Sequence, residues 1–187
     1  MRGDDAIVHR ADAATISRLA QCDFSFMVDA EFAEPFDGSR IIPVDPPYRK
    51  TYGFVPDDLA EYLNRPDAEL FIAEVRDSPV GYAAVSEGWN RFAVIDDIAV
   101  DASHRGNGIA RRLMDAAVEW ARGAALAGVR LETQSNNVAA CRFYDRYGFV
   151  LGGYDRCLYQ GMHPGTPEVA LFCYLMFTTA DRSLERT

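Results

Sequence analysis

The spacing of apolar residues in the first half of the chain predicts short strands and helices in alternation. Residues 6–11 (AIVHRA) predict a strand, and residues 11–22 (ADAATISRLAQC) have helical spacing. Residues 57–66 (DDLAEYLNRP) predict one short helix that ends at its proline. Two apolar runs, 68–75 (AELFIAEV) and 80–87 (VGYAAVSE), flank the turn-forming residues RDSP and predict a β-hairpin.

The second half continues the same alternation. Residues 92–100 (FAVIDDIAV) predict a central strand that is apolar apart from two adjacent acids, and the helix after it carries Ile109, Leu113 and Ala117 on one face. A strand at 128–133 is followed by a helix at 136–148, opened by an asparagine cap and closed by a glycine. Two further strands are expected within 149–159 and 168–177. The pattern predicts an α/β fold in which a mixed sheet of six or seven strands is flanked by three or four helices.

Residues 35–56 differ from the rest of the chain because they hold five prolines and several aromatic residues. We expect no regular structure there, and a long ordered loop of this kind is more often functional than idle. Tyr48, Arg49, Lys50 and Tyr52 are candidates for its substrate-facing residues, with a plain surface loop as the alternative.

Composition indicates a globular protein. The chain has 187 residues, of which 49% are hydrophobic and 25% charged, so we expect one domain over residues 1–187 with a mobile tail at 178–187. The N-terminus has no secretory signal and no apolar run reaches the ~20 residues of a membrane span, which makes the cytoplasm the expected location. The four cysteines lack CxxC spacing and His9, His104 and His163 are scattered, so no metal site is predicted.

The formal net charge of −9 changes the expected partners. It argues against nucleic acid, which is bound through a basic face, and we expect no membrane partner. It suits a cationic small molecule, although an acidic surface is also a common route to solubility. The sequence leaves the oligomeric state open, a homodimer included.

The junction between the central strand and the next helix combines glycine with arginine. In HRGNGIARR, residues 104–112, Gly106 and Gly108 stand just before the helix and three arginines surround them. A helix N-terminus has unpaired N–H groups and about half a positive charge, so arginine there is reasonable where a phosphate binds. The alternative is a tight turn with solvated or paired arginines.

The spacing at this junction limits which phosphate ligand could bind. The P-loop pattern GxxxxGK[ST] is absent. The dinucleotide pattern GxGxxG is half met, but Arg111 stands where the third glycine should be, which disfavours a nicotinamide oxidoreductase.

Two linked motifs resemble the GNAT superfamily of N-acetyltransferases. The acetyl-CoA signature [Q/R]xxGx[G/A] is matched from Arg105 to Ala110, and N-x-x-A-x-x-x-Y-x-x-x-G-F is matched from Asn137 to Phe149. Residues 128–155 together with PPYRKTY at 46–52 look like the streptothricin acetyltransferases within that superfamily. The resemblance implies the GNAT acyl-CoA N-acyltransferase fold. It also implies an acetyl-CoA-dependent enzyme that acetylates a primary amine of a small cationic substrate, streptothricin before all others.

The resemblance also implies residue roles for acetyl-CoA as the cosubstrate. The residues that would contact it are Ile98, Ala99, Val100, Arg105, Gly106, Asn107, Gly108, Ile109, Ala110, Arg111, Asn137, Ala140 and Tyr144. Tyr144 matches the family tyrosine that protonates the departing thiolate, and its alternative is a packed aromatic side chain. Asn137 would hold the pantetheine arm, or simply cap its helix.

A base is also needed, because an alkyl ammonium with a pKa near 10.4 must lose a proton before it attacks. Asp96, Asp97 and Glu132 are the candidates, with salt bridges to Arg91 or Arg130 as the alternative. Strand alternation predicts that Asp96 and Asp97 point to opposite faces. Covalent catalysis by Cys141 is disfavoured because no histidine accompanies it in the motif.

Two other functions stay open at this point. One is a GNAT acetyltransferase that acts on a different amine, such as a peptide, a polyamine or an aminoglycoside. The other is a non-catalytic module that binds acyl-CoA, for which Tyr144 and a base would be unnecessary.

Overall fold

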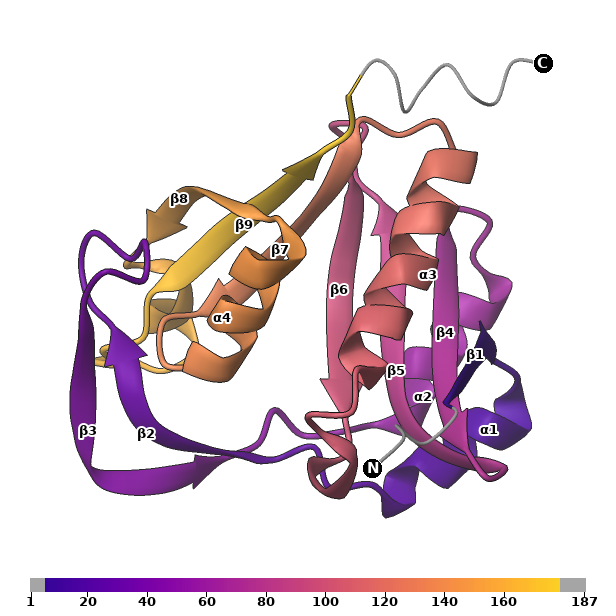
Figure 1. Ribbon diagram of the computed structural model, residues 1–187, viewed down its shortest axis with the longest axis horizontal. Helices are drawn as coiled ribbons and strands as arrows, with labels where there is room; N and C mark the ends of the chain where they lie inside the picture. The colour runs from indigo at the N-terminus through magenta and orange to yellow at the C-terminus, as the bar shows by residue number, and fades with distance from the viewer. Residues whose placement is uncertain (1–5, 179–187) are drawn as a thin grey trace. The chain divides into compact units, whose positions relative to one another are not determined.

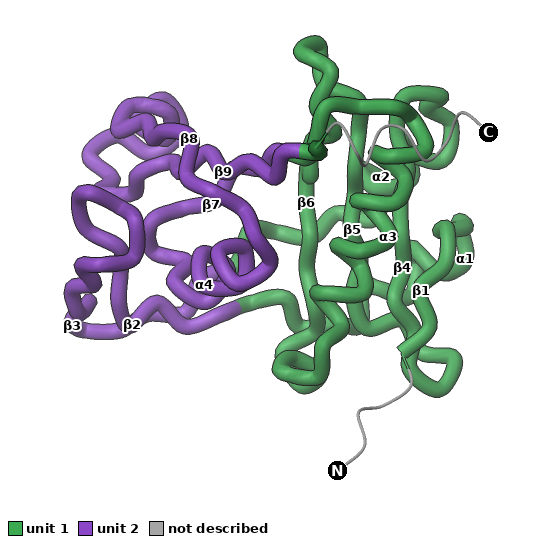
Figure 2. The backbone as a smooth tube through the Cα atoms, turned by 45° about the horizontal axis from the view of Figure 1, so that its top comes forward, with its two compact units in different colours: residues 1–25, 51–129, 177–187 green, residues 26–50, 130–176 purple. Residues whose placement is uncertain are grey.

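The computed structural model describes residues 6–178, which form two compact units (Figure 2). Unit 1 contains residues 6–25, 51–129 and 177–178 of the described chain, and unit 2 contains residues 26–50 and 130–176. The strand order of the seven-stranded sheet is β1-β4-β5-β6-β7-β9-β8, and β2 and β3 form a separate two-stranded sheet. The predicted number of strands is therefore confirmed.

Unit 1 is a four-stranded antiparallel arrangement with helices on both faces. Its elements, in chain order, are β1 (Ile7–Arg10), α1 (Ala13–Arg18), the 3₁₀ helix η1 (Leu19–Gln21), α2 (Pro56–Ala60), η2 (Glu61–Asn64), β4 (Ala68–Val75), β5 (Ser78–Glu87), β6 (Ala93–Val100), η3 (Ala102–His104) and α3 (Ile109–Gly123). Helix α3 packs on one face of β4, β5 and β6, while α1 and α2 lie on the other (Figure 1). The apolar face predicted for α3 is confirmed, since Ile109, Leu113 and Ala117 are buried.

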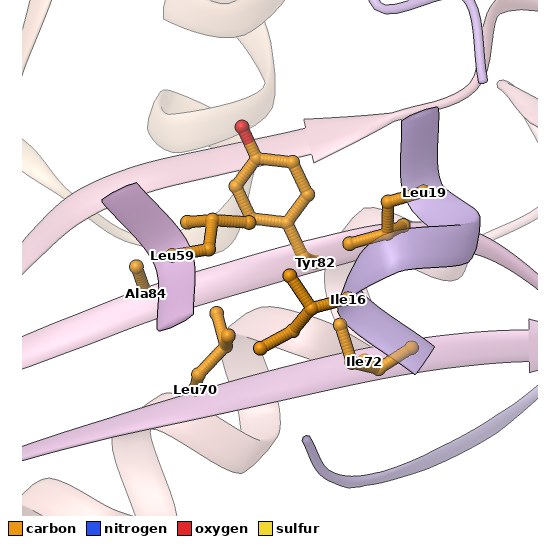
Figure 3. Close-up of a cluster of buried hydrophobic side chains, with 7 residues drawn as sticks. All are labelled: Ile16, Leu19, Leu59, Leu70, Ile72, Tyr82 and Ala84. Carbon is orange, nitrogen blue, oxygen red and sulfur yellow. The ribbon is translucent and has the colours of Figure 1, made fainter. Parts of the chain in front are cut away.

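The core on the α1 and α2 side explains why these short helices form. Seven buried residues make up this cluster (Figure 3): Ile16, Leu19, Leu59, Leu70, Ile72, Tyr82 and Ala84. Side chains of α1, η1 and α2 thus cover alternate residues of β4 and β5, and burial of each large side chain contributes roughly 1.5–3 kcal/mol. The Tyr82 ring packs within the cluster, whereas its hydroxyl points away from the aliphatic side chains (Figure 3).

Unit 2 consists of a hairpin and a three-stranded arrangement around one helix. Its elements are β2 (Phe26–Phe32), β3 (Ile41–Lys50), most of β7 (Gly128–Gln134), α4 (Val138–Tyr147), β8 (Val150–Asp155), η4 (Leu158–Gly161) and β9 (Ala170–Met176). Helix α4 begins after Asn137, whose side chain caps it, and ends at Gly148 with φ 115°. Both ends of α4 are as predicted.

The expectation that residues 35–56 lack regular structure is wrong. Ten of them form β3, which pairs antiparallel with β2. The register jumps between Val28–Tyr48 and Ala30–Pro43, so Pro46 and Pro47 fall in the irregular part of the pairing. Proline is tolerated at edges and bulges because no ladder hydrogen bond is lost there.

Residues 179–187 of the predicted tail lie outside the described residues. Among residues 6–178, no helix is both long and apolar enough to cross a membrane. The four cysteines are free thiols. The described part of the chain holds no group of three or more His, Cys, Asp or Glu side chains suited to a metal ion.

Candidate functional site

The turn between β6 and α3 leaves the N-terminus of a 15-residue helix without a side-chain cap. Gly106 and Gly108 have φ of 80° and 79°, in the left-handed region that favours glycine. A Cβ added to either glycine would meet no atom within 4 Å, so the space beside the turn is open. Open space and uncapped helix amides are what a phosphate group requires.

Two of the three arginines at this turn bind backbone carbonyls. Arg105 donates from Nε to the Val100 oxygen at 2.9 Å and from Nη1 to the Ser25 oxygen at 2.8 Å. Arg112 donates to the Ala6 oxygen at 2.9 Å. Arg105 therefore ties the turn to the end of β6, and Arg111 lies exposed in the first turn of α3.

Asp101, at the start of the connection, organises the residues that lead into the turn. Its Oδ1 accepts from the Ser103 N–H at 3.0 Å and the Ser103 hydroxyl at 2.5 Å, and it lies 2.9 Å from His104 Nδ1. Its Oδ2 accepts from the Asp23 N–H at 2.8 Å. Partial burial alone would raise the pKa of Asp101, but the bonds from Ser103, His104 and Asp23 outweigh it and lower that pKa to about 2. The connection is therefore held by an ionised carboxylate.

The end of β6 is fixed by its pairing with β5. Ile98 pairs with Ala83, and Val100 pairs with Gly81. A Cβ on Gly81 would lie 2.7 Å from the Ala99 carbonyl oxygen, so only glycine allows this close approach. The backbone of residues 98–100 is therefore held rigidly.

Asp96 and Asp97 lie at a β-bulge in β6. Ile95 pairs with Val85 and Asp97 with Ala84, which leaves Asp96 as the extra residue between them. The expectation that alternation sends the two carboxylates to opposite faces is wrong for this reason. Both lie beside tyrosines, and Arg91 pairs instead with Glu87 at 3.8 Å.

Tyr62 and Tyr82 are the partners of the two carboxylates. The buried Tyr82 hydroxyl donates to Asp97 Oδ2 at 2.5 Å. Burial, followed by the charge of Asp96 and a hydrogen bond to it, raises the pKa of Tyr62. The pKa of Asp97 is raised because protein atoms pack closely around its carboxylate, although the residue stays accessible to solvent. Hydrogen bonds from the Tyr82 hydroxyl and the Ile98 N–H act in the opposite direction and lower this pKa. A carboxylate with a raised pKa is a stronger base than an ordinary aspartate.

Aromatic rings surround this pair of tyrosines in unit 1. Phe24 lies 5.3 Å from both Phe54 and Tyr82, and its contact with Tyr82 is edge-on. Phe54 and Tyr82 are 5.7 Å apart. Two carboxylates at the rim of an aromatic cluster form an environment in which an alkyl ammonium group can bind.

The second motif lies on α4 in unit 2. The Asn137 side chain accepts from the Ala140 N–H at 3.2 Å, so it does cap the helix. Tyr144 is 7% exposed, and its ring lies 5.4 Å from Phe143 and 5.9 Å from Phe149. The motif residues are thus fixed by the helix cap and by ring packing.

Unit 2 also contains the candidate base Glu132 and the candidate nucleophile Cys141. The Tyr159 hydroxyl donates to Glu132 Oε1 at 2.5 Å. Burial, followed by the neighbouring Cys173, raises the pKa of the Cys141 thiol to about 12. A thiol of that pKa is almost entirely protonated at neutral pH, which argues against a cysteine nucleophile.

Sequence reasoning missed Tyr62, Tyr82 and Asp101. Tyr82 lies in an apolar strand whose interior residues are all buried, so the sequence did not distinguish it from a packed aromatic residue. Asp101 precedes Ser103 by two residues, which is a local capping pattern that could have been noticed.

Comparison with known proteins gives consistent results. Residues 36–149 match the model of the Acetyltransferase (GNAT) family. The chain is 38% identical to the streptothricin acetyltransferase of Escherichia coli over 128 residues, which cover 68% of this chain and 70% of the relative. It is 37% identical to the streptothricin acetyltransferase of Streptomyces lavendulae over 160 residues, which cover 80% and 82%.

Two solved structures are also similar to the chain. One is an acetyltransferase of Bacillus anthracis in complex with acetyl coenzyme A, with a TM-score of 0.79, 34% identity, and coverage of 92% of this chain and 100% of the other. The other is a nourseothricin acetyltransferase, with a TM-score of 0.76, 33% identity, and coverage of 91% and 98%.

Proposed function

The chain belongs to the acetyltransferase (GNAT) family, and we propose that it transfers the acetyl group of acetyl-CoA directly to a primary amine of streptothricin. The observation that supports streptothricin as the substrate is the 37% identity to a streptothricin acetyltransferase over four-fifths of this chain. The acidic net charge of −9 agrees with a cationic acceptor. Antibiotic inactivation in the cytoplasm is the role that follows.

The turn after β6 fits the diphosphate of acetyl-CoA, because its helix amides are uncapped and the space beside both glycines is open. When bound, acetyl-CoA supplies an activated acetyl thioester. Backbone N–H groups between Arg105 and Arg111 would hold the diphosphate, and the backbone of Ile98–Val100 would contact the pantetheine arm and the acetyl oxygen. By resemblance to the family, Asn137 and Ala140 are further candidates for contact with acetyl-CoA. An N–H that stabilises the negative charge on the acetyl oxygen is worth roughly 3–4 kcal/mol.

Asp97 is our choice for the base among the three candidate carboxylates. Its raised pKa brings it closer to that of the ammonium from which it removes a proton. Asp96 supports this role because its like charge acts in the same direction. Asp97 and Glu132 each accept a hydrogen bond of 2.5 Å from a tyrosine hydroxyl, so the feature that favours Asp97 is the second carboxylate, Asp96, beside it.

Tyr144 is the proton donor in this proposal. A phenol with an ordinary pKa near 10 can protonate a thiolate, whose conjugate acid has a pKa near 8.5. Its fixed position on α4, between Phe143 and Phe149, supports a role in which one hydroxyl must be held in place.

The test is release of free thiol from acetyl-CoA by the purified protein. Streptothricin should release thiol well above the blank that lacks it, and mass spectrometry should find the antibiotic heavier by one acetyl group. A panel of a peptide amine, a polyamine and an aminoglycoside serves as the comparison. Thiol release with another amine alone would refute the substrate, and release with none would indicate a non-catalytic acyl-CoA-binding module.

A further inference from the structure

Unit 2 contains a cluster of polar side chains that the proposed reaction does not use. We call it the Asn136 cluster, and its members are Glu31 of β2, Tyr48 and Lys50 of β3, Asn136 before α4 and Glu168 before β9. These residues come from four separate segments of the chain, all within unit 2. A polar cluster assembled from so many segments needs a reason, because burial of polar groups is costly unless they are paired.

Asn136 is the centre of the cluster and is 3% exposed. Its Nδ2 donates to the Tyr48 hydroxyl oxygen and to Glu168 Oε1, both at 3.0 Å. The Oδ1 of the same amide is buried and has no hydrogen-bond partner among the described residues. A buried acceptor without a donor costs about 1–3 kcal/mol, so this oxygen marks a place where a donor is missing.

Glu31 adds a carboxylate that no cation of the described residues neutralises. Burial, followed by the charge of Glu168, raises the pKa of Glu31. Glu168 itself is paired with Lys50 Nζ at 2.6 Å, with both side chains 15% exposed. With Glu31 and Glu168 ionised and Lys50 protonated, the cluster has one negative charge in excess.

The remaining binding capacity of the cluster is therefore mainly that of an acceptor. Asn136 Oδ1 and the Glu31 carboxylate accept hydrogen bonds. The Asn136 amide donates to Tyr48 and Glu168, Lys50 donates to Glu168, and the Tyr48 hydroxyl keeps one hydrogen to donate. An anion would meet an excess of negative charge, and an apolar group would leave the orphaned oxygen unpaired. An organic cation with N–H donors meets both requirements.

We propose that the Asn136 cluster binds an ammonium or guanidinium group of the acceptor, other than the amine that is acetylated. The identity of that ligand rests on the proposed function, whereas the cation preference rests on the cluster alone. Such a contact selects acceptors with more than one positive charge. It also explains why Tyr48 and Lys50 belong to a structured hairpin rather than to an idle loop.

The test variant is Glu31→Gln, which removes the charge without changing the size of the side chain. Asp29→Asn is the matched control, because it removes the same charge from an exposed position on the same strand. Calorimetry in the absence of acetyl-CoA measures binding of two probes, streptothricin and spermidine. Steady-state kinetics with streptothricin gives KM and kcat.

Glu31→Gln should weaken the binding of both probes about tenfold, and raise the KM for streptothricin by about the same factor, with kcat and the KM for acetyl-CoA near wild type. Asp29→Asn should change neither. Asn136→Leu should weaken binding similarly, and its melting temperature is measured first. If Asn136→Leu is unfolded, Glu31→Gln alone decides.

The proposal is overturned if Glu31→Gln binds the probes as tightly as the wild type, if Asp29→Asn weakens binding equally, or if the wild type binds neither probe. A wild type that binds streptothricin through Glu31 but releases no thiol would refute the acetylation and leave the cation site standing. Normal thiol release by the wild type, together with unchanged probe binding by Glu31→Gln, would refute the cation site and leave the acetylation standing.

Discussion

Replacement of Asp101 by asparagine tests whether one carboxylate holds the connection between β6 and α3. Both carboxylate oxygens accept hydrogen bonds, Oδ1 from Ser103 and Oδ2 from the Asp23 N–H. An amide has only one acceptor oxygen, so asparagine must turn its NH₂ toward at least one donor. Since the Asp101 side chain is only 14% exposed, the donor left unpaired costs about 1–3 kcal/mol.

The pKa of Asp101 gives a second measure of the same interaction. The fall from the ordinary 3.8 to about 2 corresponds to about 2 kcal/mol. Because the folded-state pKa of Asp101 is lower than the unfolded one, this contribution to the free energy of unfolding is fully present above about pH 4. It is lost as the pH falls through about 2.

Urea unfolding measures the effect of Asp101→Asn directly. We expect a loss of about 2 kcal/mol at pH 7, and a difference from wild type that shrinks as the pH falls below about 4. If most of that cost falls on the turn, the KM for acetyl-CoA rises about tenfold, since a tenfold change corresponds to about 1.4 kcal/mol. The control is Glu119→Gln, which removes an exposed charge in the middle of α3.

Two results would refute this reasoning. A loss of stability below about 0.5 kcal/mol, equal to that of a typical surface substitution, would show that the four contacts of Asp101 are not a structural requirement. A loss of about 2 kcal/mol in the free energy of unfolding, with an unchanged KM for acetyl-CoA, would show that the turn keeps its shape without the contacts of Asp101.

Three further substitutions test the proposed roles. Tyr144→Phe should lower kcat by roughly 10²–10⁴ without changing the KM for acetyl-CoA, and an unchanged kcat would remove Tyr144 from the role of proton donor. Asp97→Asn should lower kcat but should not lower the melting temperature at pH 7. Because the pKa of Asp97 is raised in the folded state, its ionisation destabilises the fold as the pH rises. A neutral amide avoids that cost, and its oxygen can still accept the hydrogen bond from Tyr82. A lower melting temperature would contradict the sign of this pKa shift. Gly108→Glu should abolish binding of acetyl-CoA in calorimetry, because it places a carboxylate beside the helix amides at a residue with φ 79°; wild-type affinity would refute the diphosphate site.

Local patterns were enough to predict most of the fold. The β4–β5 hairpin, β6, α3 and α4 were predicted from apolar periodicity and from their caps, because each of them is stabilised by contacts that repeat along its own sequence. β3 was missed because proline propensity is a local property, whereas tolerance of proline depends on the partner strand. No pattern within residues 41–50 reveals that the pairing with β2 jumps at Val28.

The candidate site shows the same division between local and non-local information. The motifs from Arg105 to Ala110 and from Asn137 to Phe149 are local patterns, so both can be recognised in the sequence alone. The positions of Asp96 and Asp97 depend on a bulge whose existence is a property of two strands, so periodicity gave the wrong faces. The Asn136 cluster joins residues up to 137 positions apart in the chain, from Glu31 to Glu168, and no spacing rule could have assembled it.

The two substrates make opposite electrostatic demands on one acidic chain. With a net charge of −9, the protein as a whole repels the anionic acetyl-CoA, so affinity for it must come from short-range donors. The guanidinium groups of Arg105, Arg111 and Arg112 add their charge to that of the uncapped backbone amides at the start of α3, so this turn is a local source of positive potential. Salt screens this potential over about 8–10 Å, so it attracts a diphosphate without repelling a polycation bound farther away. The cationic acceptor, by contrast, is attracted by the whole protein and, in our proposals, meets carboxylates at Asp97 and at Glu31. A short positive turn within a chain of net charge −9 therefore lets one acidic protein bind both an anionic and a cationic substrate.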